Sequence, residues 1–325
     1  MILNHLAIQA TAIFGTMGVT IFFVLSGYLI TGLLVGDVEM LGTVRLRRFW
    51  ARRVRRLIPA LIVLLWVLVL AGALLAIPEI APPAGVFGAL VFSTNWAWVQ
   101  HLNVGGLNHT WSLAVEEQFY LLWPIVVLLV TRWARRPRVA VGIVAAALGA
   151  VSLTVMFTHV SSWSSERIYA GPDTRAYGLL LGAVLACVPQ PRPAPRVVAL
   201  LVWLPFPFLL GTRPGSPVEL AVVAPLAALS GAYVIWQGAR ARALSSAWIR
   251  YVGRRSYALY LWHYPLMLVA APRLPFPHRW EREVVAIAAA FVAAELSYRL
   301  VERRFLAPSK PPATMALDEL AVCGP

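Results

Sequence analysis

The sequence predicts an all-α, polytopic transmembrane helical bundle. Hydrophobic residues make up 60% of the 325 residues, charged residues only 13%, and the mean hydropathy is +0.73. Soluble domains contain roughly 45–50% apolar residues, so a lipid bilayer is the solvent that fits this composition. Long apolar runs also alternate with short arginine tracts, which is typical of helices that cross a membrane repeatedly.

Nine apolar runs are long enough to cross a bilayer as helices of roughly 17–25 residues. They lie near residues 15–35, 57–77, 113–131, 139–158, 174–190, 197–212, 217–237, 256–272 and 284–301. A tenth stretch, residues 85–100, is shorter and is interrupted by Asn95. We expect this stretch to be re-entrant or to lie on the outer face, with its backbone packed against protein.

The arginines predict the orientation of these spans. Of the 28 cationic residues, 22 lie in five tracts, which are residues 45–56, 132–138, 192–196, 240–255 and 299–310. Short basic connections face the cytoplasm, so the C-terminus is expected inside and the first residues outside, with one helix missing ahead of Met1. Because the cations are grouped between apolar runs, the net charge of +14 does not indicate a protein that binds nucleic acid.

We expect one transmembrane domain over residues 1–305 and a disordered cytoplasmic tail over residues 306–325. The tail contains three prolines and no apolar periodicity. The two cysteines provide no disulfide framework.

Residues 108–124, NHTWSLAVEEQFYLLWP, carry two adjacent carboxylates in an apolar run. Ionisable groups inside spans are costly and mark functional sites. Ser112 is expected to cap the helix, which puts Glu116 and Glu117 about one turn inside, where the helix N-terminus favours negative charge. Adjacent side chains point about 100° apart, so one carboxylate could face a site while the other pairs with an arginine. The alternative is a purely structural lock between a glutamate and an arginine.

His5 lies at the first outer boundary. Histidine is the usual general base for a hydroxyl nucleophile. A histidine so close to a terminus is also often a solvated bystander, and both interpretations stay open from the residue alone.

Two further segments carry polar groups next to predicted spans. Residues 167–178, RIYAGPDTRAYG, contain Arg167, Asp173 and Arg175, which form either an anion or sugar site or a turn with a surface pair between Asp173 and Arg175. Residues 256–266, SYALYLWHYPL, space Tyr257, Tyr260 and His263 close to one helix face. The tyrosines alone would fit an interfacial belt, while the histidine inside the span is either structural or functional.

The basic tract RLRRFWARRVRRLIP, residues 45–59, has two possible roles. Its arginines orient the protein and bind lipid head groups, and they also suit bidentate recognition of phosphate. The sequence contains no phosphate-binding loop, dinucleotide fingerprint or metal-ligand pattern. We therefore expect a mechanism with no metal and no bound cofactor, which uses a diffusible donor.

Taken together and in this order, these segments resemble the acyltransferase 3 family of bacterial integral membrane O-acyltransferases. The matching segments are FFVLSGYLIT at 22–31, RRFWARRVRRLIPAL at 47–61, HTWSLAVEEQFYLLWP at 109–124, TRAYGLLLGAVLA at 174–186, SYALYLWHYPL at 256–266 and YRLVERRF at 298–305. They cover nearly the whole chain. The chain departs from the family in having Arg304 where proline is usual and in lacking the first family helix with its basic residue.

The resemblance implies a ten-helix bundle in the bacterial inner membrane that transfers an acyl group, most simply acetyl, from acyl-CoA to a sugar hydroxyl. The acceptors implied are a cell-surface polysaccharide, a glycolipid or a macrolide glycoside. His5 matches the family histidine that activates the acceptor hydroxyl, and Glu116 or Glu117 would orient that histidine or the acceptor. The expected partners are the lipid bilayer, acyl-CoA and the acceptor.

The remaining predicted site residues fall into two sets. The substrate-binding set is Arg167, Asp173, Arg175, Trp111, Ser112, Asn95, Tyr260 and His263, and the donor-binding set is Arg52, Arg53, Arg55 and Arg56. A transporter or flippase of a glycolipid or acylated intermediate stays open as an alternative, since intramembrane Arg, Glu and His also line transport paths. An inactive, N-terminally truncated homologue is the third interpretation.

Overall fold

The computed structural model describes residues 9–189, 215–238 and 246–305. Every regular element within these ranges is helical, which confirms the predicted all-α class. The long helices are α1 (Gln9–Leu41), α2 (Leu46–Leu74), α5 (Trp111–Trp133), α6 (Pro137–His159), α8 (Pro172–Cys187), α11 (Ala224–Gly238), α12 (Ala247–Pro265) and α13 (Arg279–Ser297). The short elements are η2 (Pro78–Ile80), α3 (Pro83–Leu90), α4 (Thr94–Val99), η3 (Gly105–Thr110), α7 (Ser165–Ala170), η4 (Glu219–Val223), η6 (Leu266–Ala270), η7 (Ala271–Arg273), η8 (Tyr298–Glu302) and α14 (Arg303–Phe305).

Local sequence signals explain several helix boundaries. Gly42, with φ of +74°, ends α1 and lets the chain turn into α2. Pro137 and Pro172 are the first residues of α6 and α8, where a missing backbone N–H costs nothing. Ser246 caps α12, because its hydroxyl accepts a hydrogen bond from the backbone N–H of Ile249.

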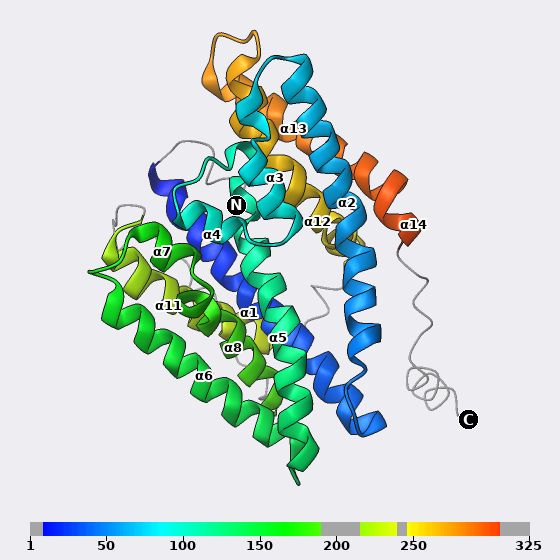
Figure 1. The fold of residues 1–325 in the computed structure, drawn as a ribbon, viewed down its shortest axis with the longest axis vertical. Helices are drawn as coiled ribbons and strands as arrows, with labels where there is room; N and C mark the ends of the chain where they lie inside the picture. Colours follow the sequence, from blue (N-terminus) through cyan, green and yellow to red (C-terminus); the bar gives the residue numbers. More distant parts are fainter. Residues whose placement is uncertain (1–8, 190–214, 239–245, 306–325) are drawn as a thin grey trace.

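The long helices form two groups with α5 between them (Figure 1). Helices α1, α6, α8 and α11 pack together in the first group, and α2, α12 and α13 form the second. Helix α5 contacts α1, α6 and α8 on one side and α2 on the other. The boundary between the two groups is where the candidate site lies.

Glycines allow α1 and α8 to approach closely. A Cβ added at Gly27 of α1 would lie 1.8 Å from the carbonyl oxygen of Leu179, and one added at Gly182 of α8 would lie 2.0 Å from that of Val24. Small residues drive helix association in membranes by this means, since lipid gives no hydrophobic force between helices. Helices α1 and α8 are therefore held by backbone-to-backbone packing.

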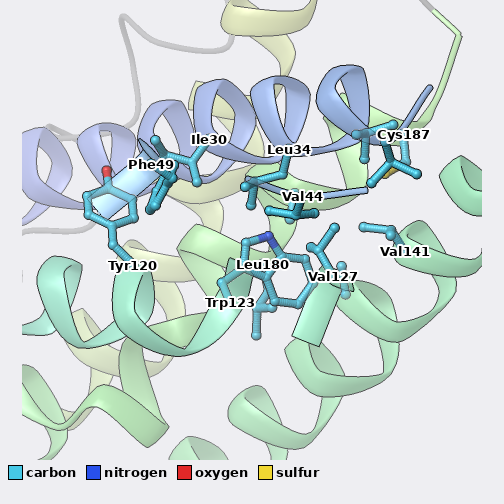
Figure 2. Packing of buried hydrophobic residues seen from close by; sticks show 14 residues of the cluster. Ile30, Leu34, Val44, Phe49, Tyr120, Trp123, Val127, Val141, Leu180 and Cys187 are labelled. Carbon is cyan, nitrogen blue, oxygen red and sulfur yellow. The ribbon is translucent and has the colours of Figure 1, made fainter. Parts of the chain in front are cut away.

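A buried apolar cluster joins this group to α5 and to the start of α2. Figure 2 shows Trp123 of α5 beneath Leu180 of α8, with Ile30 and Leu34 of α1 above. The indole N–H of Trp123 donates a hydrogen bond of 2.8 Å to the Thr31 hydroxyl, so its one polar atom is satisfied. This packing fixes the rotation of α5 about its own axis. It therefore also fixes the direction of the side chains in the preceding turn of α5, which includes residues 116 and 117.

Six helical stretches in the described ranges are long and apolar enough to cross a membrane, and all six overlap predicted spans. Of the other three predicted spans, residues 174–190 correspond to α8, which has only 16 residues. Residues 256–272 correspond to the end of α12 followed by η6 and η7, and the first half of α12 contains three arginines, Arg250, Arg254 and Arg255. The predicted span 197–212 and the predicted tail lie outside the described residues.

Residues 85–100 do not form a span, as predicted. They lie in α3 and α4, of eight and six residues, which are too short to cross a bilayer. Helix α4 packs against α5 and α7, so the segment is packed against protein.

Candidate functional site

A cavity of about 1160 Å³ lies where α1, α2, α5 and α12 meet. The side chains of Phe22, Leu25, Leu29 and Leu33 form an apolar wall along one face of α1. Hydroxyl, carboxyl, imidazole and guanidinium groups from the other three helices line it as well. A largely apolar pocket with a few convergent polar groups is the usual form of a small-molecule site.

Glu116 is the most buried acidic group of this cavity, with 4% of its surface exposed. Its carboxylate accepts hydrogen bonds from the hydroxyl groups of Ser26 on α1 and Tyr120 on α5. The guanidinium of Arg53 lies 3.9 Å away. Two hydroxyl donors and a nearby cation are the surroundings that a buried carboxylate needs.

Arg53 joins α2 to α5 through both adjacent carboxylates. Its Nη2 atom also lies 3.5 Å from Glu117, and its guanidinium carbon is 3.5 Å from the centre of the Tyr120 ring. Both glutamates and Arg53 line the cavity. The sequence left open whether the glutamates face a site or form a structural lock with an arginine. Both hold here, because the glutamates that pair with Arg53 also line the cavity.

The four predicted donor-binding arginines occupy different environments. Arg53 is committed to the glutamates, whereas Arg56 is exposed and lines the cavity. Arg52 and Arg55 are exposed and do not line this cavity.

The predicted polar face of α12 points into the cavity. Tyr257, Tyr260 and His263 all line it, and His263 is 1% exposed. The Tyr260 hydroxyl donates to the carbonyl oxygen of His109, and it lies 2.9 Å from the Ser112 hydroxyl. The Tyr257 hydroxyl donates to the carbonyl oxygen of Leu57 at 3.0 Å. These bonds tie α12 to η3, α5 and α2.

The geometry assigns one proton of the His263 ring. Its Nδ1 atom lies 2.6 Å from the carbonyl oxygen of Tyr260, and because a carbonyl only accepts, Nδ1 carries a hydrogen. In the neutral ring, Nε2 is then the nitrogen that accepts a proton. The ring of His109 lies 5.6 Å from that of His263 and stacks on Tyr264.

Ser112 does not cap α5, and this prediction was wrong. The N-cap residue is Thr110, and no side chain caps the helix. The reason is that η3 runs directly into α5, so the helix has no free first turn. Ser112 is instead the second helical residue, and its hydroxyl lies against Tyr260.

The predicted cluster of Arg167, Asp173 and Arg175 separates into two environments. Arg167 pairs with Asp173 through two hydrogen bonds of 2.7 and 2.6 Å. Arg175 is 2% exposed and donates to the hydroxyl groups of Thr20 at 2.8 Å and Tyr177 at 3.3 Å. The alternative of a surface pair between Asp173 and Arg175 was therefore wrong, because residues two apart on a helix point to nearly opposite sides.

Trp111 and Asn95 are buried in the scaffold beside the cavity and do not line it. Trp111 packs edge-on against Phe23 and close to Tyr169. Asn95 donates to the carbonyl oxygen of Ala170 at 3.3 Å and accepts from Gln118 at 3.0 Å. Both residues hold α4 and α7 to the bundle.

The structure thus brings together Arg53, Arg56, Ser112, Glu116, Glu117, Tyr260 and His263. The cavity excludes Arg52, Arg55, Asn95, Trp111, Arg167, Asp173 and Arg175, and His5 lies outside the described residues. Sequence reasoning missed Ser26 and Tyr120. Tyr120 follows Glu116 by one helical turn, which is a local signal. Ser26 is 90 residues from Glu116, and only its place in the segment FFVLSGYLIT could have pointed to it.

The fold and this cavity define a polytopic α-helical membrane protein with a charged site between its helices. A family model described as an acyltransferase domain matches residues 2–296, and the chain belongs to this family, the acyltransferase 3 family. The predicted resemblance is therefore confirmed.

Curated relatives are similar over most of this chain. It is 36% identical over 326 residues to the peptidoglycan O-acetyltransferase OatA of Listeria monocytogenes. This alignment covers 89% of this chain and 51% of the relative. It is 31% identical over 327 residues to the O-acetyltransferase OatA of Staphylococcus aureus, covering 89% and 52%. The chain thus spans about half the length of these relatives. No solved structure matches it significantly.

Proposed function

We propose that this chain is a membrane O-acetyltransferase that moves an acetyl group from acyl-CoA to a hydroxyl group of a sugar-containing acceptor. The observation that carries the proposal is the buried group of Glu116, Glu117 and Arg53 on the wall of a large cavity, in a chain of the acyltransferase family. The acceptor would be a cell-surface polysaccharide, such as the peptidoglycan that the Listeria relative's name specifies, a glycolipid or a macrolide glycoside.

In this reaction the acceptor oxygen attacks the thioester carbonyl carbon. The new C–O ester bond forms, the C–S bond breaks, and CoA leaves as a thiol once its sulfur has taken a proton. A general base must remove the acceptor's hydroxyl proton. We propose His5 for this step, because it matches the family histidine.

The charges of the cavity support a role for the carboxylates beside that base. Arg53 carries one positive charge against the two carboxylates of Glu116 and Glu117. Glu116, which accepts hydrogen bonds from the hydroxyl groups of Ser26 and Tyr120 in this group, would stabilise an imidazole as it gains the acceptor's proton. Ser112, Tyr260 and His263 add polar groups to the same wall, suited to orienting the acceptor.

Other predicted site residues are better explained as supports of the scaffold. Arg175 holds α8 to α1 through Thr20, and the pair of Arg167 and Asp173 lies outside the cavity. We further propose that the chain lies in the bacterial cell membrane with its C-terminus in the cytoplasm, because its arginine-rich connections fall on one side.

The test is transfer of label from radiolabelled acetyl-CoA into the carbohydrate or glycolipid fraction of membranes that contain the full chain. His5→Ala and Glu117→Gln should each abolish or strongly reduce incorporation. Glu79→Gln is the matched control, since this carboxylate is exposed in η2. Equal incorporation by all four proteins, or none by the wild type when it is inserted and folded, would contradict the proposal.

A further inference from the structure

A second cavity of about 410 Å³ opens beside the first, between α2 and α12. It is lined by Arg56, Arg250, Gly253, Arg254 and Glu302. Arg56 and Gly253 line both cavities. The two spaces therefore adjoin, with a glycine and an arginine at the boundary.

The second cavity is positively charged. Arg250 and Arg254 lie four residues apart on α12, so their side chains occupy one face. Among the described residues, none of the three guanidinium groups that line it forms an ion pair, in contrast to Arg53. The single acidic group there, Glu302, is buried and accepts a hydrogen bond of 3.5 Å from Ser297. The cavity is thus lined by three exposed arginines and one buried glutamate.

Such a cluster suits a ligand with several phosphate groups. Guanidinium groups bind phosphate through paired, charge-assisted hydrogen bonds, and several together bind a multiply charged anion. Both arginine-bearing segments also belong to tracts that the charge pattern assigns to the cytoplasmic side, where a CoA thioester would be met.

We propose that the phosphate-bearing nucleotide end of the thioester donor is held by Arg56, Arg250 and Arg254, with its acyl-bearing arm passing Gly253 into the first cavity. This inference rests on the proposed function and specifies how its donor binds. From Gly253 to His263, α12 rises about 15 Å at 1.5 Å per residue, so the nucleotide end and the polar face lie well apart. A long, narrow arm between a charged end and a thioester fits this separation.

Gly253 faces open space at the boundary of the two cavities. A Cβ added there meets nothing within 4 Å, so the helix tolerates a larger residue. Gly253→Leu would project a branched side chain at the boundary of the two cavities, and Gly253→Ala would add only one methyl group. The pair separates obstruction of the arm from loss of the glycine.

The first experiment compares two donors with the full-length protein in nanodiscs of phosphatidylcholine. The charge variant is Arg250→Gln with Arg254→Gln, and the matched control is Arg135→Gln with Arg136→Gln, two exposed arginines that line neither cavity. The KM for acetyl-CoA should rise about tenfold or more in the charge variant alone, as expected for lost charge-assisted hydrogen bonds. With acetyl-pantetheine, which has no phosphate, both variants should match the wild type.

The second experiment measures binding without turnover. Adenosine 3′,5′-bisphosphate should raise the unfolding temperature of the wild type and the control but not that of the charge variant. Gly253→Leu should bind this nucleotide like the wild type and transfer acetyl at least tenfold more slowly, and Gly253→Ala, which adds one methyl group, should slow transfer less than Gly253→Leu does.

The outcomes separate the two proposals. If the wild type transfers acetyl but the charge variant keeps its KM for acetyl-CoA, the donor site is wrong and the proposed function stands. If the wild type transfers nothing yet binds the nucleotide through these arginines, the proposed function fails and the site stands. If the variant differs from the wild type only in nanodiscs containing phosphatidylglycerol, and equally with both donors, the arginines bind lipid head groups and the inference is overturned.

Discussion

Replacing Arg53 with glutamine tests whether the cavity wall depends on its ion pairs. In the native protein, the Arg53 guanidinium lies 3.5 Å from Glu117 and 3.9 Å from Glu116, and it covers the ring of Tyr120. The side chains of all three charged residues are largely buried. Arg53→Gln therefore leaves both buried carboxyl groups without this cation.

The distances set the expected magnitude. At an effective dielectric constant of about 20, a pair at about 4 Å is worth about 4 kcal/mol before the cost of desolvation. Removing one partner of a buried pair is measured to cost about 3–5 kcal/mol. We therefore expect Arg53→Gln to lower the free energy of unfolding by about 3–5 kcal/mol.

The assay is equilibrium unfolding of the purified protein in mixed micelles, together with acetyl transfer at a temperature where the variant is folded. Adding Glu117→Gln to Arg53→Gln removes one of the two carboxyl groups left without this cation, so it should restore part of the lost stability without restoring activity. Arg136→Gln is exposed and should unfold like the wild type. A loss below about 1 kcal/mol in Arg53→Gln, the range of exposed pairs, would refute the assignment of Arg53 as a buried counter-ion.

Two further predictions concern packing and hydrogen bonding. Gly27→Ala should destabilise the protein by about 3 kcal/mol, the upper end of typical overpacking, because its Cβ would meet a carbonyl oxygen of α8 at 1.8 Å. The control is Gly36→Ala on the same helix, whose Cβ meets nothing within 4 Å and which should unfold like the wild type. Equal unfolding curves for the two variants would contradict this prediction. Tyr260→Phe should lose about 1–2 kcal/mol of stability, since its hydroxyl bonds to Ser112 and to a carbonyl of η3. Tyr233→Phe is its control, because that hydroxyl forms no hydrogen bond within the described ranges, and a loss as large in this variant would refute the explanation.

Local sequence signals were sufficient for features that depend on one segment. Apolar length predicted six of the nine spans correctly within the described residues, and the break at Asn95 together with the arginine count excluded residues 85–100 as a span. Helical spacing predicted that Tyr257, Tyr260 and His263 share a face, and all three line the cavity. The adjacent carboxylates of residues 116 and 117 were identified because a charge in an apolar run is costly wherever the helix packs.

Only the tertiary structure decided which polar groups meet. Ser26 reaches Glu116 across 90 residues of sequence, and Arg53 reaches the two glutamates across about 64, so no local periodicity records either contact. Arg175 turned inward to Thr20 and away from Asp173 because helix rotation, set by packing between α1 and α8, selects its neighbours. The second cavity likewise exists only where the ends of α2 and α12 converge. The sequence by itself determined the helices and the charged residues that they place in the membrane. Each of these features depends on the free energy of transferring one segment from water into lipid. The tertiary structure decided the partners of those charges, because the close approach of helices fixes which side chains face one another.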